Sequence, residues 1–149
     1  MATMNTGVLL CGKNTFKVGA TAETATMVAD IETFSVEFTY KEIAWNPHDT
    51  NGVTRRIVVL TDVKVTMNGK RNIGDTGNDF VADMAGQTGR DCEGYIEVLM
   101  PDGKLIKLEN AIYQVKNIGT GAATDAAPLE AEIYSNGSID ITKNTAATE

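Results

Sequence analysis

The most regular feature of the chain is a pair of stretches in which apolar and polar residues alternate. Residues 34–41 read FSVEFTYK, and residues 57–67 read IVVLTDVKVTM. A period of two is typical of a β-strand with one buried and one polar face. On the second strand, one side carries Ile57, Val59, Val63, Val65 and Met67, and the other carries Asp62, Lys64 and Thr66. The turn-forming residues 45–52, WNPHDTNG, lie between the strands, so the sequence predicts one long hairpin with a large polar tip.

One short helix is predicted after this hairpin. Residues 75–89 read DTGNDFVADMAGQTG and begin with residue types that cap helices. Phe80, Val81 and Met84 fall on one face, and Gly86 stops the helix after about two turns.

Strands are predicted for most of the remaining chain. They lie at residues 92–100, from Lys104 onward and at residues 129–135, and the turn Asn136-Gly137 closes back on a strand at 138–142. Six or seven strands with one helix predict a mainly β fold. The expected architecture is a two-sheet β-sandwich or barrel with one short flanking α-helix and a long β-hairpin.

The strand that starts at Lys104 loses its alternation halfway. Ile106 and Leu108 share one parity, whereas the apolar residues at 111, 113 and 115 share the other, with Glu109-Asn110 between the two sets. Because a slip of one residue turns every side chain to the opposite face, the pattern predicts a β-bulge at Glu109-Asn110. We expect the strand to bend there and to cross from one packing surface to another.

The length and composition indicate a single domain. A chain of 149 residues that is 42% hydrophobic suits one core spanning 1–149. We interpret residues 1–30 as an extended N-terminal arm plus a first strand, and residues 143–149 as a flexible C-terminal tail. The two cysteines, Cys11 and Cys92, are predicted to be buried free thiols. No basic-then-apolar leader opens the sequence and no apolar run is long enough to span a bilayer, so we expect a soluble protein made in the cytoplasm.

The charge balance argues against a protein that grips nucleic acid. The chain has 13 Lys plus Arg against 20 Asp plus Glu, a net charge of −7. Its longest basic clusters are the pairs Arg55-Arg56 and Lys70-Arg71. Tight binding to phosphates requires larger basic patches, so we do not expect it here.

The motifs that suggest catalysis or metal binding are weak. Residues 7–14, GVLLCGKN, resemble a phosphate-binding loop but end in Asn14, which lacks the hydroxyl that would bind magnesium. His48 is the only histidine and lies in a polar loop, and the acidic residues near Asp75 lack the final Glu of a calcium loop. We therefore predict no catalytic residue, no metal site and no cofactor, and a protein that is not an enzyme.

Two non-enzymatic classes remain, an assembly subunit and a binding module. The second would be a β-sandwich that binds carbohydrate or a cell surface, and such modules usually present an exposed aromatic platform. Its candidate residues here are Trp45, Tyr95, Tyr113 and Tyr134, of which the tyrosines fall within predicted strands.

The order of parts resembles the tail tube proteins, or major tail proteins, of long-tailed bacteriophages. The resemblance rests on the capped helix, on Tyr95-Ile96-Glu97-Val98 leading into Pro101-Asp102-Gly103, on Val115 and Ile118-Gly119, and on residues 128–133 followed by Asn136-Gly137. The long hairpin before the helix also fits, and the similarity covers roughly residues 30–142. The inner tubes of contractile injection systems share this subunit plan, and the sequence leaves open which type of tail is involved.

The resemblance implies a structural subunit that forms hexameric rings, which stack into a hollow tube for DNA delivery. In such tubes, the hairpins of neighbouring copies join into one barrel around the lumen. The implied partners are further copies of the chain, a tail-tip or baseplate initiator, a terminator and, in contractile tails, a sheath. DNA would pass only as transient cargo. The implied location is the virion tail, assembled in the host cytoplasm.

Two sets of site residues follow as hypotheses. The polar face of the hairpin would line the lumen, where an acidic wall repels DNA; its residues are Ser35, Glu37, Thr39, Asp62, Lys64 and Thr66. The loop between the strands would contact the next ring; its residues are Trp45, Asn46, His48, Asp49, Arg55 and Arg56. The alternative for this loop is a segment that is disordered in the free monomer, which is compatible with ordering on assembly.

Overall fold

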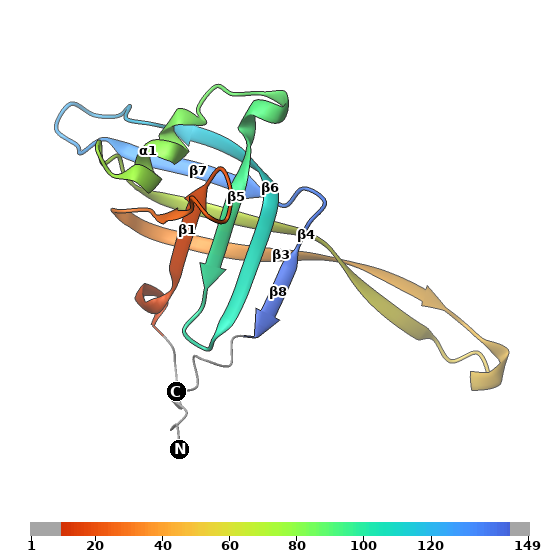
Figure 1. The fold of residues 1–149 in the computed structure, drawn as a ribbon. Helices are drawn as coiled ribbons and strands as arrows, with labels where there is room; N and C mark the ends of the chain where they lie inside the picture. Colours follow the sequence, from red (N-terminus) through yellow and green to blue (C-terminus); the bar gives the residue numbers. More distant parts are fainter. Residues whose placement is uncertain (1–9, 144–149) are drawn as a thin grey trace, which may run out of the picture.

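Eight β-strands and one α-helix make up the regular structure of residues 10–143, the part of the chain that the computed structural model describes (Figure 1). The strands are β1 (Thr15–Gly19), β2 (Thr26–Met27), β3 (Ile31–Trp45), β4 (Arg55–Lys70), β5 (Glu93–Leu99), β6 (Lys104–Asn117), β7 (Pro128–Tyr134) and β8 (Asp140–Lys143). The helix is α1 (Thr76–Asp83), and three 3-10 turns are η1 (Cys11–Lys13), η2 (His48–Thr50) and η3 (Gly89–Cys92). No helix among these residues is long and apolar enough to cross a membrane.

All the strands are antiparallel and belong to one continuous sheet. Their order is β2-β1-β5-β6-β7-β4-β3, and β8 pairs with the first part of β6. The sheet folds over on itself, so that β1, β5 and β8 run across the direction of β3, β4 and β7 (Figure 1). The predicted mainly β fold is confirmed. The two layers are nevertheless hydrogen-bonded to each other through β6, which pairs with β5 along one edge and with β7 along the other.

The predicted bulge in β6 is present and explains how one strand serves both layers. Gly94 lies opposite Ala111 and Ile96 lies opposite Leu108, so Glu109 and Asn110 together face the single residue Tyr95. Asn110 has a positive φ of 56°, the left-handed conformation that such bulges use. The extra residue keeps the apolar side chains before and after it in the same hydrophobic core.

The core lies between the two layers and beneath α1. Its fully buried residues alternate along the strands, as at Val63, Val65 and Met67 of β4. The ring of Phe80 in α1 packs edge-on against Tyr113 of β6, with centroids 5.6 Å apart. The buried hydroxyl of Tyr113 donates a hydrogen bond to the Tyr95 carbonyl. Burying this polar group is therefore compatible with an otherwise apolar core.

The helix forms where the sequence predicts it. The Asp75 carboxylate caps the first turn by accepting a hydrogen bond from the Asn78 backbone N–H, at 3.0 Å. Val81 and Met84 are buried, and the chain leaves the helical conformation at Gly86, whose φ is 80°. Both predicted signals, an acidic cap and a glycine stop, act as expected.

One sequence-based interpretation is wrong. The turn at Asn136-Gly137 does not fold β8 back onto β7; β8 pairs with β6 instead, with Ile106 opposite Ile141. The sequence did not show this pairing, because strand alternation indicates a buried face but not which strand lies next to it. Within residues 1–30, where an arm and a first strand were expected, the structure has β1 and β2, and Val18 of β1 is fully buried.

The cysteine prediction is confirmed for Cys92, which is a buried free thiol. The Cys11 side chain, residues 1–9 of the predicted arm and residues 144–149 of the predicted tail lie outside the part that the structure describes.

Candidate functional site

The hairpin of β3 and β4 is the most prominent feature of the molecule and extends well beyond the folded sheet (Figure 1). The strands contain 15 and 16 residues. β7 accompanies β4 only over Lys64–Lys70, so the root of the hairpin belongs to the body and the rest does not. We call residues 31–39 with 62–70 the proximal half, and residues 40–60 the distal half.

The six residues predicted to share a polar face do lie together, in the proximal half. They form three opposed pairs, Ser35 with Thr66, Glu37 with Lys64 and Thr39 with Asp62. The other face of the same strands meets the core, through buried side chains on β4 and half-buried phenylalanines on β3. The proximal half therefore has one apolar and one polar face, as the alternation predicts.

The polar face continues onto β7 and β6, which the sequence analysis missed. Lys64 lies opposite Tyr134 in the register, and Thr66 lies opposite Glu132. Glu132 in turn lies opposite Gln114 of β6. The alternation LEAEIY at residues 129–134 was visible, but it could not reveal that β7 pairs with β4.

Charged groups on this enlarged face are paired with each other. The Lys64 ammonium lies 2.8 Å from one Glu132 carboxylate oxygen, and the Lys116 ammonium lies 3.6 Å from the other. The hydrogen bond from Lys64 is the main cause that lowers the pKa of Glu132, and the same bond raises the pKa of Lys64. Both groups are held in their charged forms at neutral pH.

A second bulge, which the sequence analysis did not predict, separates the two halves of the hairpin. Thr39 lies opposite Asp62, but the next residue, Tyr40, lies opposite Leu60, so Thr61 is the extra residue of β4. Beyond the bulge, Lys41 pairs with Val59. Because a bulge shifts the parity of its strand, Ile57 and Val59 share the face of Asp62 and not that of Val63. The prediction that placed Ile57 and Val59 with Val63 is therefore wrong.

The distal half presents apolar side chains on both faces. Within the described residues, the large apolar side chains of this segment that remain exposed are Tyr40, Ile43, Trp45, Val53, Ile57, Val58 and Val59. Tyr40 and Val53 keep 62% and 67% of their surface exposed. Single exposed apolar residues are common, but a concentration of this kind usually marks an interaction site.

The loop residues predicted as a contact site lie at the far tip. Trp45 ends β3 and Arg55 begins β4, and the guanidinium of Arg55 lies 6.0 Å from the Trp45 ring centroid. Arg56 donates a hydrogen bond to Glu42 across the strands, at 2.8 Å. His48 and Asp49 belong to η2. The predicted residues are thus close to one another at the far end of the hairpin.

Internal hydrogen bonds shape the tip. The Asn46 side chain donates to the Gly52 carbonyl and the Thr54 hydroxyl. The Thr50 hydroxyl lies 2.9 Å from the Val53 carbonyl and 3.2 Å from the Pro47 carbonyl, and its single hydrogen can be donated to either. The loop is therefore a compact turn that can present Trp45 and its neighbours from a defined backbone.

Both outer edges of the hairpin are available for pairing. β3 ends the strand order, so within residues 10–143 no strand pairs with its outer edge. β4 has no second partner strand from Arg55 to Asp62, because its pairing with β7 begins at Lys64 and the backbone of Val63 is hydrogen-bonded to Ser135. Long unpaired edges attract other strands, and proteins usually shield them.

The aromatic residues of the binding-module alternative do not form a platform. Tyr95 and Tyr113 are each only 2% exposed. Tyr134 is half-buried beside Lys64, and Trp45 lies on the distal hairpin. Because two of the four rings are buried, these residues do not present a common exposed aromatic surface.

Comparison of the sequence with protein-family models and with curated proteins finds no match. The fold, in contrast, is shared with several solved structures. A chain in the virion of a native gene transfer agent particle superposes with a TM-score of 0.66 at 13% identity, covering 91% of this chain and 99% of that chain. A chain in the tail of an empty gene transfer agent particle, which has C6 symmetry, gives a TM-score of 0.66 at 14% identity, with the same coverage.

A third match comes from an extracellular contractile injection system. A chain in its sheath/tube terminator in the extended state has a TM-score of 0.63 at 11% identity, covering 92% of this chain and 98% of that chain. At these identities, the similarity shows a common fold. The resemblance to tail tube proteins related to contractile injection systems is confirmed at that level.

Proposed function

We propose that the protein is a non-enzymatic structural subunit of a tail tube, which polymerises as stacked, hexameric rings into a hollow conduit for DNA. The observation that carries the proposal is the long hairpin, whose root belongs to the body and which has no partner strand on the outer edge of β3 or beside the distal part of β4 in the described residues. The fold shared with chains of virion and tail particles supports it. The protein would accordingly reside in the virion tail.

The edges suggest how copies join. The free edge of β3 and the free part of β4 lie on opposite sides of one hairpin, so a neighbour can add a strand on each side. A contact between two different surfaces of identical chains closes into a ring when the rotation allows it. Edge pairing around such a ring would leave no strand edge exposed. Six copies per ring would agree with the C6 symmetry of the gene transfer agent tail.

The proximal polar face is proposed to line the conduit. Four carboxylates lie on or beside it, from Glu37, Asp62, Glu130 and Glu132, against two amines, from Lys64 and Lys116. The excess of negative charge would repel the phosphates of DNA, and the ion pairs at Glu132 leave no lysine cluster to hold them. A wall with low affinity for its cargo suits a channel through which DNA moves.

The distal half is proposed to be covered by other copies of the chain. Its apolar residues would be unfavourable beside a water-filled channel, and burying them would remove a large apolar area from water. Residues 40–60 carry three cationic side chains, Lys41, Arg55 and Arg56, against two acidic ones, whereas the whole chain has a net charge of −7. The distal half is therefore attracted to the acidic remainder of a second copy. Contact with the next ring, through Trp45 and the loop, would follow from its position at the tip.

Further partners belong to the same proposal. A tube of this kind needs an initiator at the tail tip or baseplate and a terminator at its other end, and a contractile tail would add a sheath. The matched structures include a sheath/tube terminator and a sheath-tube complex of an extracellular contractile injection system.

Negative-stain electron microscopy of the purified protein across a range of concentrations, combined with light scattering, tests the proposal. Hollow tubes or rings of uniform width are expected, either from the protein alone or after addition of a tail-tip assembly. A protein that stays monomeric at high concentration, even with that assembly present, would contradict the proposed function. Removal of residues 47–53 should leave folding intact and block polymerisation, whereas unchanged tubes would argue against a role for the loop.

A further inference from the structure

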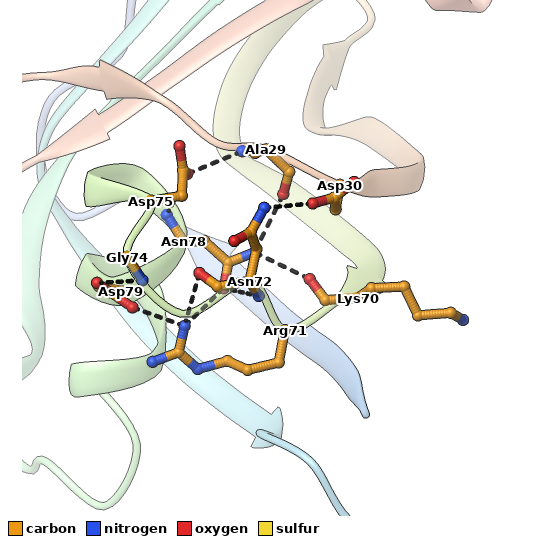
Figure 2. A network of polar contacts seen from close by, with 9 residues as sticks. All are labelled: Ala29, Asp30, Lys70, Arg71, Asn72, Gly74, Asp75, Asn78 and Asp79. Carbon is orange, nitrogen blue, oxygen red and sulfur yellow. Dashed lines mark hydrogen bonds and ion pairs between the residues drawn. The ribbon is translucent and has the colours of Figure 1, made fainter. Parts of the chain in front are cut away.

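A buried asparagine joins α1 to the base of the hairpin, where β3 begins and β4 ends. Asn78 lies in the first part of α1 and is completely buried. Figure 2 shows it at the centre of a network that includes the turn before β3 and the segment after β4. The side-chain amide donates to the Ala29 carbonyl at 3.0 Å and to the Lys70 carbonyl at 2.9 Å. Asn78 therefore contacts the chain just before β3 begins and the last residue of β4.

Every hydrogen-bonding position of this side chain is used. Its oxygen accepts from the Asn72 backbone N–H at 3.0 Å and from the Arg71 guanidinium at 2.9 Å. An asparagine amide offers two donor hydrogens and two acceptor positions, and all four are paired here. No other side chain of the same shape can supply both donors and acceptors at these places. Position 78 therefore requires a side chain with donors and acceptors in these directions, and a side chain of the right volume alone would not suffice.

Asp75, the cap of α1, holds the same turn. One of its carboxylate oxygens accepts from the Ala29 backbone N–H at 3.0 Å, as well as from the N–H of Asn78. Both polar backbone groups of Ala29 are consequently bound by side chains at the start of α1 (Figure 2). We call Asp75, Asn78 and Arg71 the root clamp.

The backbone segments around the root clamp are closely packed. They therefore have no room to shift and replace the hydrogen bonds that the clamp makes. A Cβ atom at Gly69 would overlap the Asp30 carbonyl, and one at Gly77 would overlap the Met27 carbonyl. Asp30 itself has a positive φ of 61°, and the Lys70 N–H donates to its carbonyl at 2.8 Å. β3 therefore starts from a turn whose position is set by α1 and by the end of β4.

The position of this root matters because the hairpin is a long lever. A strand of 15 residues is about 50 Å long, and a tilt of about 5° at its root would displace its tip by roughly 4 Å. A displacement of this size would disrupt strand pairing between copies, because the lengths of hydrogen bonds vary far less. β3 has β4 as its only neighbouring strand in the described sheet. Its half-buried side chains, such as Phe34, pack on the core, and the clamp holds the turn from which the strand starts.

We propose that the root clamp sets the direction of the hairpin and thereby the register in which copies of the chain join. Asn78 and Asp75 act as positioning residues, since they lie at the root and not on the surfaces that would pair. The part of this inference that concerns assembly rests on the proposed function. The direction of the hairpin, in contrast, can be measured in the free protein.

The test compares Asn78→Asp with Tyr113→Phe. The first change replaces the two donor hydrogens by an acceptor that faces the Ala29 and Lys70 carbonyls, while its shape is kept. The control removes a different buried polar group, the hydroxyl that donates to the Tyr95 carbonyl, and leaves the clamp intact. Spin labels at Asp49→Cys, on the tip, and Lys104→Cys, on the body, report the distance between them in a background with Cys11→Ser and Cys92→Ser.

The clamp predicts a broadened or shifted tip-to-body distance distribution for Asn78→Asp, together with loss of tube formation. It predicts a narrow distribution and retained tubes for Tyr113→Phe. An unchanged distribution in Asn78→Asp, or equal broadening in both variants, would overturn the inference.

A milder variant covers the case in which Asn78→Asp does not fold. Arg71→Gln removes the guanidinium that donates to Asn78 and Asp79 but keeps the buried amide. A broadened distribution is again expected, and one identical to that of the unmodified protein would overturn the inference. If the unmodified protein forms no tubes at all, the proposed function fails, whereas the distance measurement still decides whether the clamp directs the hairpin.

Discussion

Val59 and Asp62, three residues apart on β4, lie on the same face of the hairpin. Their partners on β3, Lys41 and Thr39, are two residues apart, and the bulge at Thr61 absorbs the difference. Without the bulge, an odd spacing would put the two side chains on opposite faces. One face of the hairpin consequently changes from polar to apolar along its length, which gives the two halves different environments in the proposed tube.

This change predicts that an added charge has opposite consequences in the two halves. Val59→Glu should abolish tube formation, because it places a carboxylate in a surface proposed to be buried between copies. Thr39→Glu, on the same face but in the proximal half, should leave tubes intact. Both positions are exposed in the free chain, so the free energy of unfolding should change by less than about 0.5 kcal/mol in each.

Sedimentation and electron microscopy of the two variants, at equal protein concentration, provide the readout. Tubes from Val59→Glu of normal width and number would show that the distal half is not an interface.

The bulge of β6 predicts that position 110 strongly favours residues that adopt a positive φ. Asn110→Val should reduce the free energy of unfolding by about 1–2 kcal/mol, since a β-branched residue is strained at a φ of 56°. Asn110→Gly, the matched variant, should be close to neutral because glycine adopts this conformation freely. Urea denaturation measures both, and equal stabilities would mean that the left-handed conformation at this residue is not required.

The ion pair between Lys64 and Glu132 predicts a dependence of stability on pH. Its hydrogen bond lowers the pKa of Glu132 in the folded protein below the ordinary value of 4.5. The stabilisation is therefore complete above that ordinary value and is lost as the pH falls through the lowered pKa. Glu132→Gln should be less stable than the unmodified protein at pH 7, and the difference should shrink in acid.

Urea denaturation of both proteins at several pH values checks this expectation. A difference in the free energy of unfolding that stays constant from pH 7 to below the ordinary pKa would indicate that the ion pair does not contribute.

The buried hydroxyl of Tyr113 predicts that removing this one group lowers the free energy of unfolding measurably. Tyr113→Phe should reduce the free energy of unfolding by about 1–2 kcal/mol, because the Tyr95 carbonyl loses its donor inside the core. The contact of the ring with Phe80 is retained. Thermal or urea denaturation gives the value, and no change would imply that water replaces the hydroxyl.

The bulges at Glu109-Asn110 and at Thr61 show what could and could not be predicted from the sequence. In β6, buried residues of both parities flank Glu109-Asn110, so the conflict was visible in the alternation and the bulge was predicted at the right place. In β4, residues 57–60 are all apolar, and such a run has no parity to read. Only the register with β3 places the bulge at Thr61.

The candidate site was predictable to the same extent. The six polar residues of the proximal half were found because their alternation is a local pattern. The contribution of Glu132 was missed because it depends on β7 lying beside β4, a long-range pairing. The root clamp was partly visible, since Asp75 was read as a cap, but the burial of Asn78 between two distant backbone segments has no signature in the sequence.

A cryo-electron microscopy reconstruction of tubes assembled from this protein would show which surface of the hairpin faces the channel. We expect stacked rings with a continuous β-barrel in which Ser35, Glu37 and Thr39 point into the lumen and Val59 is covered by a second copy. A channel lined by Phe34, Val36 and Phe38, or an assembly without a lumen, would contradict it.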